Sequence, residues 1–343
     1  MVGHIGVVGR VNGFAHRHFL GLLAGAYLLA AVWPGAGAAV RHAAVLDTGA
    51  GTMIPLPVVL LGFLLFNAGL TADAKDLGGV VRRPAALVAG VAATVAVPLA
   101  VVAGLAAVLG WWHDPDEARC LVAGLGAVAA MPVAGSSAAW SQRAGGSTAL
   151  SLGLVVASTL LSPLTTPLAL AAVCPPAAGD GAALGGPGTI TFLLVGVVLP
   201  SVAGMVVRRL VGGAVVIPWQ PPLKLAGTAV LLVLCYANAT AALPAVAADP
   251  DWDYLALVVV AAVLLCGSGF AAGLAVARLV GATGPQRRSL VFGLGMTNNG
   301  TGLVLAGAFL GGVPAAILPV LAYNLLQHLV AGTVSRRLGP DGR

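Results

Sequence analysis

The sequence predicts an all-α, polytopic membrane protein. Of its 343 residues, 59% are hydrophobic and only 8% are charged, and the mean hydropathy is +1.00. A soluble domain carries about 25% charged residues because water must solvate its surface. The 11 acidic and 17 basic side chains are too few for that, so lipid must solvate most of this surface. The chain also lacks the alternation of apolar and polar residues over about 10 positions that transmembrane barrel strands need, which leaves helices.

Ten apolar stretches lie between the charged positions, and each offers the roughly 20 residues that a membrane-spanning helix needs. They cover residues 14–33, 53–71, 84–111, 118–142, 147–173, 189–208, 222–245, 254–278, 286–310 and 313–335. The 48 glycines and 22 prolines fit this interpretation, since helices in lipid tolerate both. Arg10 and Arg17 precede the apolar run of the first stretch, and small residues follow it at 35–38, a pattern that is also typical of a cleaved signal peptide. That alternative leaves nine helices.

The placement of charge predicts the topology. With a cytoplasmic N-terminus, 15 of the 17 basic residues lie on the cytoplasmic side, and only Arg41 and Arg119 lie outside. Eight of the 11 acidic residues lie outside, leaving Asp73, Asp76 and Asp341 inside. We therefore expect a multi-pass protein of the cell's inner (plasma) membrane with both termini in the cytoplasm. The sequence pI of 9.6 then reflects topology, and no nucleic-acid partner is expected.

Ten helices divide into two halves of five, and an odd number per half inverts one half relative to the other. The expected repeats are residues 14–173 and 189–335, followed by a short cytoplasmic tail, 336–343. The fourth and ninth stretches hold corresponding places, and each is interrupted, at Met131–Ser137 and at Gly293–Gly300. Interrupted helices in corresponding positions indicate a transporter's binding site, because they expose backbone N–H and C=O groups at membrane depth.

Polar residues in these stretches are the candidate substrate ligands. Thr297, Asn298 and Asn299 follow one another beside glycines, and each needs a hydrogen-bonding partner in hydrocarbon. A neighbouring helix can supply that partner, but three such residues in succession favour a site. His328, within the last stretch, is a fourth candidate. The sequence equally allows a structural role, in which a neutral His328 bonds to a neighbouring helix. No acidic residue falls inside a predicted helix, which excludes a relay of buried carboxylates.

Other chemistries lack their motifs. The four cysteines, Cys120, Cys174, Cys235 and Cys266, have no paired spacing, so neither a zinc site nor a disulfide framework is predicted. The sequence contains no phosphate-binding loop, nucleotide fingerprint or hydrolase elbow, and no nucleophile–base pair at membrane depth. We therefore expect neither an enzyme nor an ATP-driven pump, and no cofactor other than a sodium ion.

Several motifs repeat the pattern of a known family. Phe66–Thr71 followed by Arg82–Pro84 reads G-L-T before a basic–proline pair, and Gly295–Gly300 reads G-M-T-N-N-G. The others are Met131–Ser137, Ala149–Ser151 with Ser158–Pro167, and Gln327–His328 before Gly332. Together they resemble the bile acid:sodium symporter family, whose pattern is G-M-Q-N-x-G at the second interruption and W-H-N-I-S-G in the last helix. The resemblance extends along most of the chain.

The resemblance implies a fold of ten helices in two inverted repeats. The first two helices of each repeat would form a panel domain, and the other six would form a core domain. The fourth and ninth helices would be unwound and would cross at the membrane midplane, with two sodium sites behind the crossing. The substrate, usually an amphipathic organic anion, would lie in the cavity between the core and the panel.

The resemblance carries over only some of the family's ligands. Ser137 and Ser151 match sodium-binding serines, and Asn298 and His328 match positions that face the substrate. The family's glutamate, two residues before G-M-Q-N, is Gly293 here. Its other sodium-site side chains are also replaced, by Ala93, Ala138, Val155 and Thr297. One neutral cation site therefore remains as an expectation, with Ser136, Ser137, Ser151 and backbone carbonyls near Met296 as its ligands.

The function expected from these residues is secondary active transport of a small organic anion or related metabolite by alternating access. The lipid bilayer and that substrate are the expected partners, and sodium is the first candidate for the coupling ion. One alternative is a proton-coupled or uncoupled carrier that uses His328. A second is a non-transporting membrane receptor of the same fold, which the missing glutamate motivates. An arsenite-type efflux carrier is disfavoured, because Met131 and Gly293 stand where its thiol and acidic partner would be.

Overall fold

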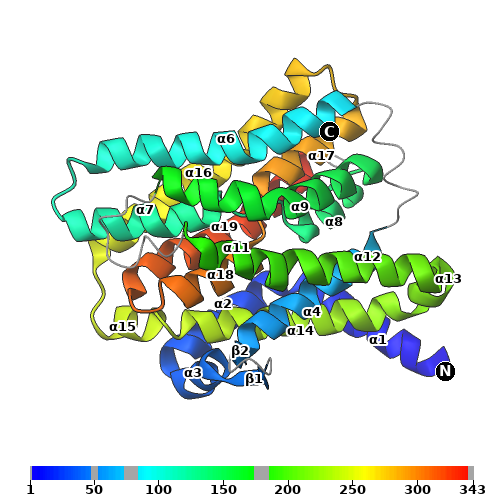
Figure 1. Cartoon of the computed structure of the whole chain (residues 1–343), viewed down its shortest axis with the longest axis horizontal. Helices are drawn as coiled ribbons and strands as arrows, with labels where there is room; N and C mark the ends of the chain where they lie inside the picture. The colour runs from blue at the N-terminus through cyan, green and yellow to red at the C-terminus, as the bar shows by residue number, and fades with distance from the viewer. Residues whose placement is uncertain (1, 48–52, 73–83, 174–184, 339–343) are drawn as a thin grey trace. The chain divides into compact units, whose positions relative to one another are not determined.

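The computed structural model describes residues 2–47, 53–72, 84–173 and 185–338 (Figure 1). The predicted loop residues Arg82 and Arg83, the cysteine at 174 and residues 339–343 of the predicted tail lie outside the described residues. The chain divides into two compact units, each assembled from two separate stretches. Unit 1 is Met1–Asp73 with Leu194–Asp249, and unit 2 is Ala74–Leu193 with Pro250–Arg343.

Unit 1 consists mainly of helices, with one small hairpin. Its elements are α1 (Val2–Arg17), α2 (Phe19–Val32), α3 (Pro34–His42), β1 (Ala44–Asp47), β2 (Met53–Pro55), α4 (Leu56–Thr71), the π-helical turn η1 (Leu194–Val198), α12 (Leu199–Val211), α13 (Gly213–Val216), the 3₁₀ turn η2 (Ile217–Trp219), α14 (Gln220–Ala239) and α15 (Leu243–Ala248). The strands β1 and β2 pair antiparallel, with Ala44 opposite Pro55. This hairpin is a departure from the all-α class that the sequence predicts.

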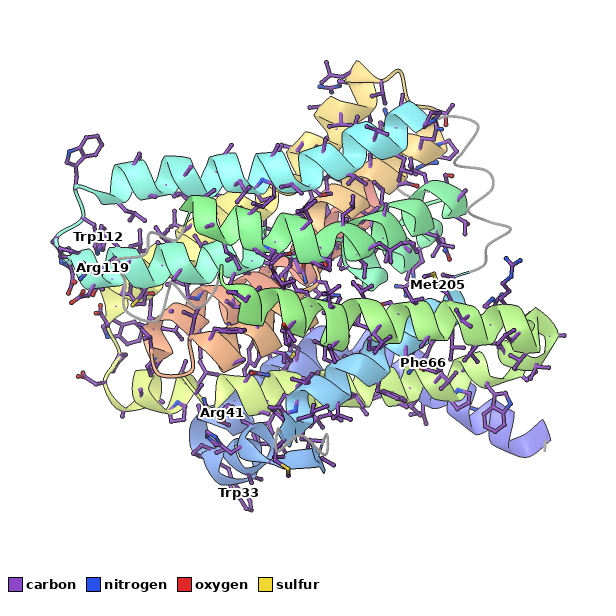
Figure 2. All side chains as sticks on the ribbon, in the orientation of Figure 1. Trp33, Arg41, Phe66, Trp112, Arg119 and Met205 are labelled. Carbon is purple, nitrogen blue, oxygen red and sulfur yellow. The ribbon has the colours of Figure 1, made fainter. Side chains whose placement is uncertain are left out.

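Two glycines set the packing within unit 1. A Cβ atom on Gly69 of α4 would overlap the carbonyl oxygen of Ser201 in α12. A Cβ atom on Gly204 of α12 would overlap the carbonyl oxygen of Phe66 in return. The two helices therefore touch backbone to backbone, as small residues allow in membranes. Figure 2 labels Phe66 and Met205 at this crossing.

Unit 2 contains the longest helices. Its elements are α6 (Pro84–Leu109), α7 (Pro115–Ala129), α8 (Gly135–Arg143), α9 (Thr148–Val173), α11 (Pro187–Leu193), α16 (Trp252–Leu279), α17 (Gly284–Gly295), α18 (Asn299–Phe309) and α19 (Pro314–Leu338). The helix α16 packs against α17, α6 and α19, and α7 packs against α19 and α6 (Figure 1). Gly273 allows α16 to approach α17, because a Cβ atom there would lie 2.5 Å from the Cα of Val291.

Six helical segments are long and apolar enough to cross a membrane. They are Pro84–Leu109, Thr148–Val173, Pro187–Val211, Gly213–Ala239, Trp252–Leu279 and Pro314–Leu338, and each matches a predicted span. The chain is therefore a helical, polytopic membrane protein, as its composition predicts.

The other four predicted spans are shorter, bent or broken. In the first, Gly9–Ala15 and Phe19–Val32 meet at 68°. The second corresponds to α4, which has 16 residues. The fourth and ninth are each divided into two helices, at the interruptions that the sequence predicts. The total of ten spanning helices, and their arrangement as inverted repeats, stay predictions.

Candidate functional site

The two interrupted stretches meet each other inside unit 2. The first break separates α7 from α8, and the second separates α17 from α18. Val133 and Thr297 form an isolated antiparallel bridge between the two breaks. The structure thus brings together two segments that are far apart in the sequence.

Backbone hydrogen bonds hold this bridge on both sides. The N–H of Ala134 donates to the carbonyl of Met296 at 3.0 Å. The N–H of Asn298 donates to the carbonyl of Pro132 at 2.8 Å. Pro132 has no N–H of its own and disfavours helix at the residue before it, which explains why the chain is unwound here. Each break therefore satisfies part of the backbone that the other exposes.

Side chains of the neighbouring helices satisfy more of the freed backbone. Ser158 of α9 accepts the N–H of Val133 at 3.0 Å, and Thr166 of α9 donates to the carbonyl of Ala130 at 2.7 Å. Gln327 of α19 accepts the N–H of Thr297 at 3.2 Å. Unwound backbone within a membrane protein needs such partners, because no bulk water is present to supply them. The sequence analysis did not predict that these side chains support the unwound backbone. The signal available in the sequence was the row of hydroxyl and amide side chains at helical spacing.

The predicted substrate residues form a polar network at the second break. Thr297 donates from Oγ1 to Oδ1 of Asn299 at 3.2 Å, and Asn299 donates weakly to Oδ1 of Asn324 at 3.5 Å. Asn298 is half-buried, and its side chain caps α18 by accepting the N–H of Thr301 at 3.3 Å. Of the three successive residues, Asn298 is thus the most accessible, while Thr297 and Asn299 are buried behind it.

His328 is buried in α19, one helical turn after Asn324. Residues four apart lie on the same face of a helix, so these two side chains share a face. Gln327, its preceding residue, bonds directly to the second break. The break segments themselves, Ala130–Ala134 and Met296–Asn298, carry no charged side chain. The two breaks are thus formally neutral, and α19 contributes two titratable side chains, His328 and Tyr323, of which Tyr323 hydrogen-bonds Thr297.

The predicted cation ligands are in different surroundings. Ser136 is exposed on α8, whereas Ser137 is 1% exposed. The Ser137 hydroxyl is buried and has no hydrogen-bond partner among the described residues. The carbonyl of Met296 already accepts the N–H of Ala134. Ser137 is therefore the predicted ligand with the greatest unsatisfied hydrogen-bonding capacity.

Ser151, the remaining predicted cation ligand, belongs to a closed cluster of three serines. Its hydroxyl lies 2.8 Å from that of Ser141 and 3.0 Å from that of Ser289, and these two lie 3.1 Å apart. Ser289 also donates to the carbonyl of Ser147 at 3.0 Å. The cluster connects α8, α9 and α17 and contains two residues, Ser141 and Ser289, that sequence reasoning missed. The four-residue spacing of Ser137 and Ser141 on one helix face was the available signal.

Hydrocarbon occupies the space beside Gly293, the position that the resemblance assigns to a glutamate. A Cβ atom on Gly293 would lie 2.7 Å from Cδ1 of Leu154. Leu154 is fully buried in an apolar cluster with Val133 and Leu294, and Ala93 and Val155 pack against that cluster. An uncompensated carboxylate is strongly disfavoured in such a place. Three of the replaced positions, Gly293, Ala93 and Val155, therefore lie against this apolar cluster.

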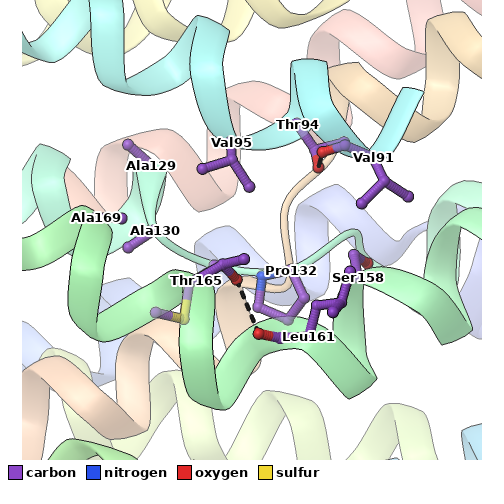
Figure 3. Close-up of a pocket in the computed structure, with 11 residues that line it drawn as sticks. Val91, Thr94, Val95, Ala129, Ala130, Pro132, Ser158, Leu161, Thr165 and Ala169 are labelled. Carbon is purple, nitrogen blue, oxygen red and sulfur yellow. Dashed lines mark hydrogen bonds between the residues drawn. The ribbon is translucent and has the colours of Figure 1, made fainter. Parts of the chain in front are cut away.

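A small pocket lies beside the first break (Figure 3). It is lined by Ala129–Pro132 together with residues of α6 and α9, including the hydroxyl-bearing Thr94, Ser158 and Thr165. Its volume is about 10 Å³, which is about the space that one water molecule requires. It is therefore too small for an organic substrate.

Asn67 of α4, in unit 1, also has unsatisfied side-chain atoms. Both the Nδ2 and the Oδ1 of Asn67, in α4, are buried without a hydrogen-bond partner among the described residues. A buried amide without partners costs about 1–3 kcal/mol, so such a group is usually satisfied by water or by a ligand. Its lack of partners depends on tertiary packing, which sequence reasoning could not evaluate.

These observations define a multi-pass helical membrane protein with two broken helices joined at a polar, uncharged crossing. Comparison with known proteins identifies the group to which it belongs. The profile of the Sodium Bile acid symporter family matches residues 58–245, more than half of the chain. The chain belongs to this family, and the resemblance inferred from the break motifs is confirmed.

The chain is also 28% identical, over 286 residues, to the uncharacterized sodium-dependent transporter YocS of Bacillus subtilis (strain 168). The match covers 82% of this chain and 83% of the Bacillus protein. Members of the family are transporters, not enzymes, so the functional class is a membrane transporter of small molecules.

Proposed function

We propose that this chain is a secondary active transporter that moves a small organic anion, or a related metabolite, by alternating access. The observation that carries this proposal is the bridge between Val133 and Thr297. It joins two broken helices, so that exposed backbone and amide side chains gather at one point. A ligand bound there is shared by both helices and can bias their arrangement.

In this proposal, Asn298 is the principal substrate contact. It is the accessible member of the polar network, and its amide can both donate and accept hydrogen bonds. Thr297, Asn299 and His328 complete the binding site from the buried side. Two helices, α8 and α18, begin directly after the breaks, and helix N-termini favour anions. A neutral site with two such termini suits a monoanion.

We further propose that the transport cycle couples to at most one sodium ion. The unpaired hydroxyl of Ser137, with carbonyls at the breaks, is the best-supported part of that site. The closed serine cluster around Ser151 and the packing of Leu154 against Gly293 both argue against a second ion. The name of the Bacillus relative, a sodium-dependent transporter, favours sodium over other cations.

The two compact units are the proposed moving parts. Unit 2 contains the stretches that the family resemblance assigns to a core, and unit 1 contains those assigned to a panel. This composition supports the proposal of ten helices in two inverted repeats, residues 14–173 and 189–335. We place the protein in the cell's inner (plasma) membrane with both termini in the cytoplasm, on the strength of its charge distribution.

Uptake into proteoliposomes tests the proposal. Purified protein is reconstituted, and the uptake of labelled keto acids and hydroxy acids is measured with and without an inward sodium gradient. We expect uptake of at least one of these anions, with a Hill coefficient for sodium of about 1. Uptake that ignores sodium and is lost in His328→Ala would overturn the sodium version and support proton coupling.

A non-transporting receptor is the second candidate function, because hydrocarbon fills the space at Gly293. Counterflow distinguishes it from a carrier. Vesicles loaded with unlabelled anion accumulate labelled anion only if the binding site alternates between the two sides. Binding detected by thermal shift without any counterflow would establish the receptor and reject transport.

A further inference from the structure

Acidic side chains gather where three helix ends of unit 2 meet. The loop after α6 leads into α7 at Pro115, and α16 begins nearby at Trp252. Five of the chain's 11 acidic residues lie in these short segments: Asp114, Asp116, Glu117, Asp251 and Asp253. Figure 2 labels Trp112 and Arg119 at this end of the unit. In a chain with only 8% charged residues, such a concentration of one sign needs an explanation.

Two of these acids have a structural role. Asp114 caps α7 by accepting the N–H of Asp116 at 2.7 Å, and Asp251 caps α16 by accepting the N–H of Tyr254 at 3.1 Å. Helix caps of this kind are common and need no ligand. Asp116 forms an ion pair with Arg119. Glu117 and Asp253 cap neither helix, and Asp253 instead lies beside His113.

Glu117 and Asp253 converge with His113 from three different segments. One possible ligand atom of each of these three residues lies within 4.8 Å of the other two. The Nε2 of His113 is 2.7 Å from an oxygen of Asp253. The indole N–H of Trp112 donates to Glu117 at 2.7 Å and holds that carboxylate in place. Among the described residues, this is the group of histidine, cysteine and acidic side chains with the spacing of a metal site.

The charge balance favours a cation at this place. The ligand atoms of Glu117 and Asp253 lie within 4.8 Å of each other, and Asp251 is a further carboxylate beside them. Like charges held together repel one another, and a bound cation relieves that repulsion. The side chains of His113 and Asp253 are 61% and 56% exposed, so an ion can reach them from solvent.

We propose that His113, Glu117 and Asp253 bind a divalent transition-metal ion, with zinc as the best fit. Zinc accepts both imidazole nitrogen and carboxylate oxygen as ligands, and three protein ligands leave its fourth position for water. The imidazole argues against calcium and magnesium, which prefer oxygen ligands. A tetrahedral zinc ion with bonds of about 2.1 Å holds its ligands about 3.4 Å apart. The side chains of His113 and Asp253 are exposed, which leaves them room to adjust to that spacing.

The bound ion fastens the loop after α6 to the first turns of α7 and α16. Its effect is therefore on the stability of unit 2 at this end, and the proposal does not depend on which substrate the protein carries. The ion replaces the hydrogen bond between His113 and Asp253, since a metal-bound imidazole nitrogen carries no proton.

Titration of the full-length protein tests the site. Protein purified in detergent, with its affinity tag removed, is stripped with a chelator and titrated with zinc chloride, with magnesium and calcium chloride as comparisons. We expect one zinc per chain, a higher melting temperature with zinc, and a weaker response to the other two ions. Cobalt should give the visible absorption bands of a tetrahedral site.

Variants locate the ion. His113→Ala and Glu117→Gln should each raise the zinc dissociation constant at least about tenfold. Asp116→Asn, which changes an acid in the same turn of α7 without touching the group, should leave it unchanged. The metal-free melting temperature of each variant shows that it is folded. Absence of stoichiometric zinc binding, or binding that survives the double variant of His113 and Glu117, would overturn the proposal and leave an ordinary ion pair.

Discussion

The two breaks meet at one bridge, but their surroundings differ in chemistry. The first break, Ala130–Ala134, is supported by the hydroxyls of Ser158 and Thr166 and contributes mainly backbone. The second, Met296–Asn298, is surrounded by amides and has Asn298 at its accessible side. Hydrogen-bonding amide side chains are therefore concentrated at the second break. The first break serves as its backbone partner.

A second contrast lies at the end of the helix α17. The end of α17 leads into the polar network at Thr297, whereas Gly293, just before it, packs against Leu154. Polar groups thus lie at the proposed substrate contact, whereas hydrocarbon lies where the family resemblance places a cation ligand. The two proposed roles therefore belong to different chemical surroundings, although only a few residues separate them.

The largest effect is expected at Asn298. Asn298→Ser keeps an oxygen that can cap α18 but removes the amide that we assign to the substrate. Transport should fall at least about tenfold, because a site built for a hydrogen bond loses it. The melting temperature should stay close to that of the parent protein. If this folded variant takes up substrate as well as the parent protein does, the substrate site is not at the second break.

An intermediate effect is expected at Thr166. Thr166→Val preserves the shape of the side chain but leaves the carbonyl of Ala130 without its donor. An unpaired buried group costs about 1–3 kcal/mol, so the melting temperature should fall. The apparent substrate affinity should hold if the first break has only a structural role. Thr165→Val, on the same helix with its hydroxyl bonded to its own helix at Leu161, is the matched control.

The smallest effects on stability distinguish Ser137 from Ser141, which lie one helical turn apart on α8. Ser137→Ala removes an unpaired hydroxyl and should change stability by less than about 0.5 kcal/mol without sodium. It should abolish the sodium-induced rise in melting temperature. Ser141→Ala breaks the serine cluster and should cost about 1 kcal/mol while leaving the sodium response intact. The reverse pattern would show that the cation binds at the serine cluster instead of at Ser137.

Local patterns were sufficient for the class of protein and for the position of both breaks. The apolar stretches predict the helices, and Pro132 and the glycines around Met296 mark the unwound segments. The crossing of the two broken helices was expected only from a family resemblance, and the bridge between Val133 and Thr297 was not predicted, since no local rule pairs distant segments. The serine cluster and the contact of Leu154 with Gly293 depend on which helix faces meet. These contacts are properties of tertiary packing, which spacing along one chain does not contain.

The crossing of α4 and α12 has a mechanical consequence. Gly69 and Gly204 each contact a backbone carbonyl of the opposite helix. At this point no side chain lies between the two helices. The two helices therefore cannot approach each other more closely at this point, and an added methyl group at either glycine would force them apart.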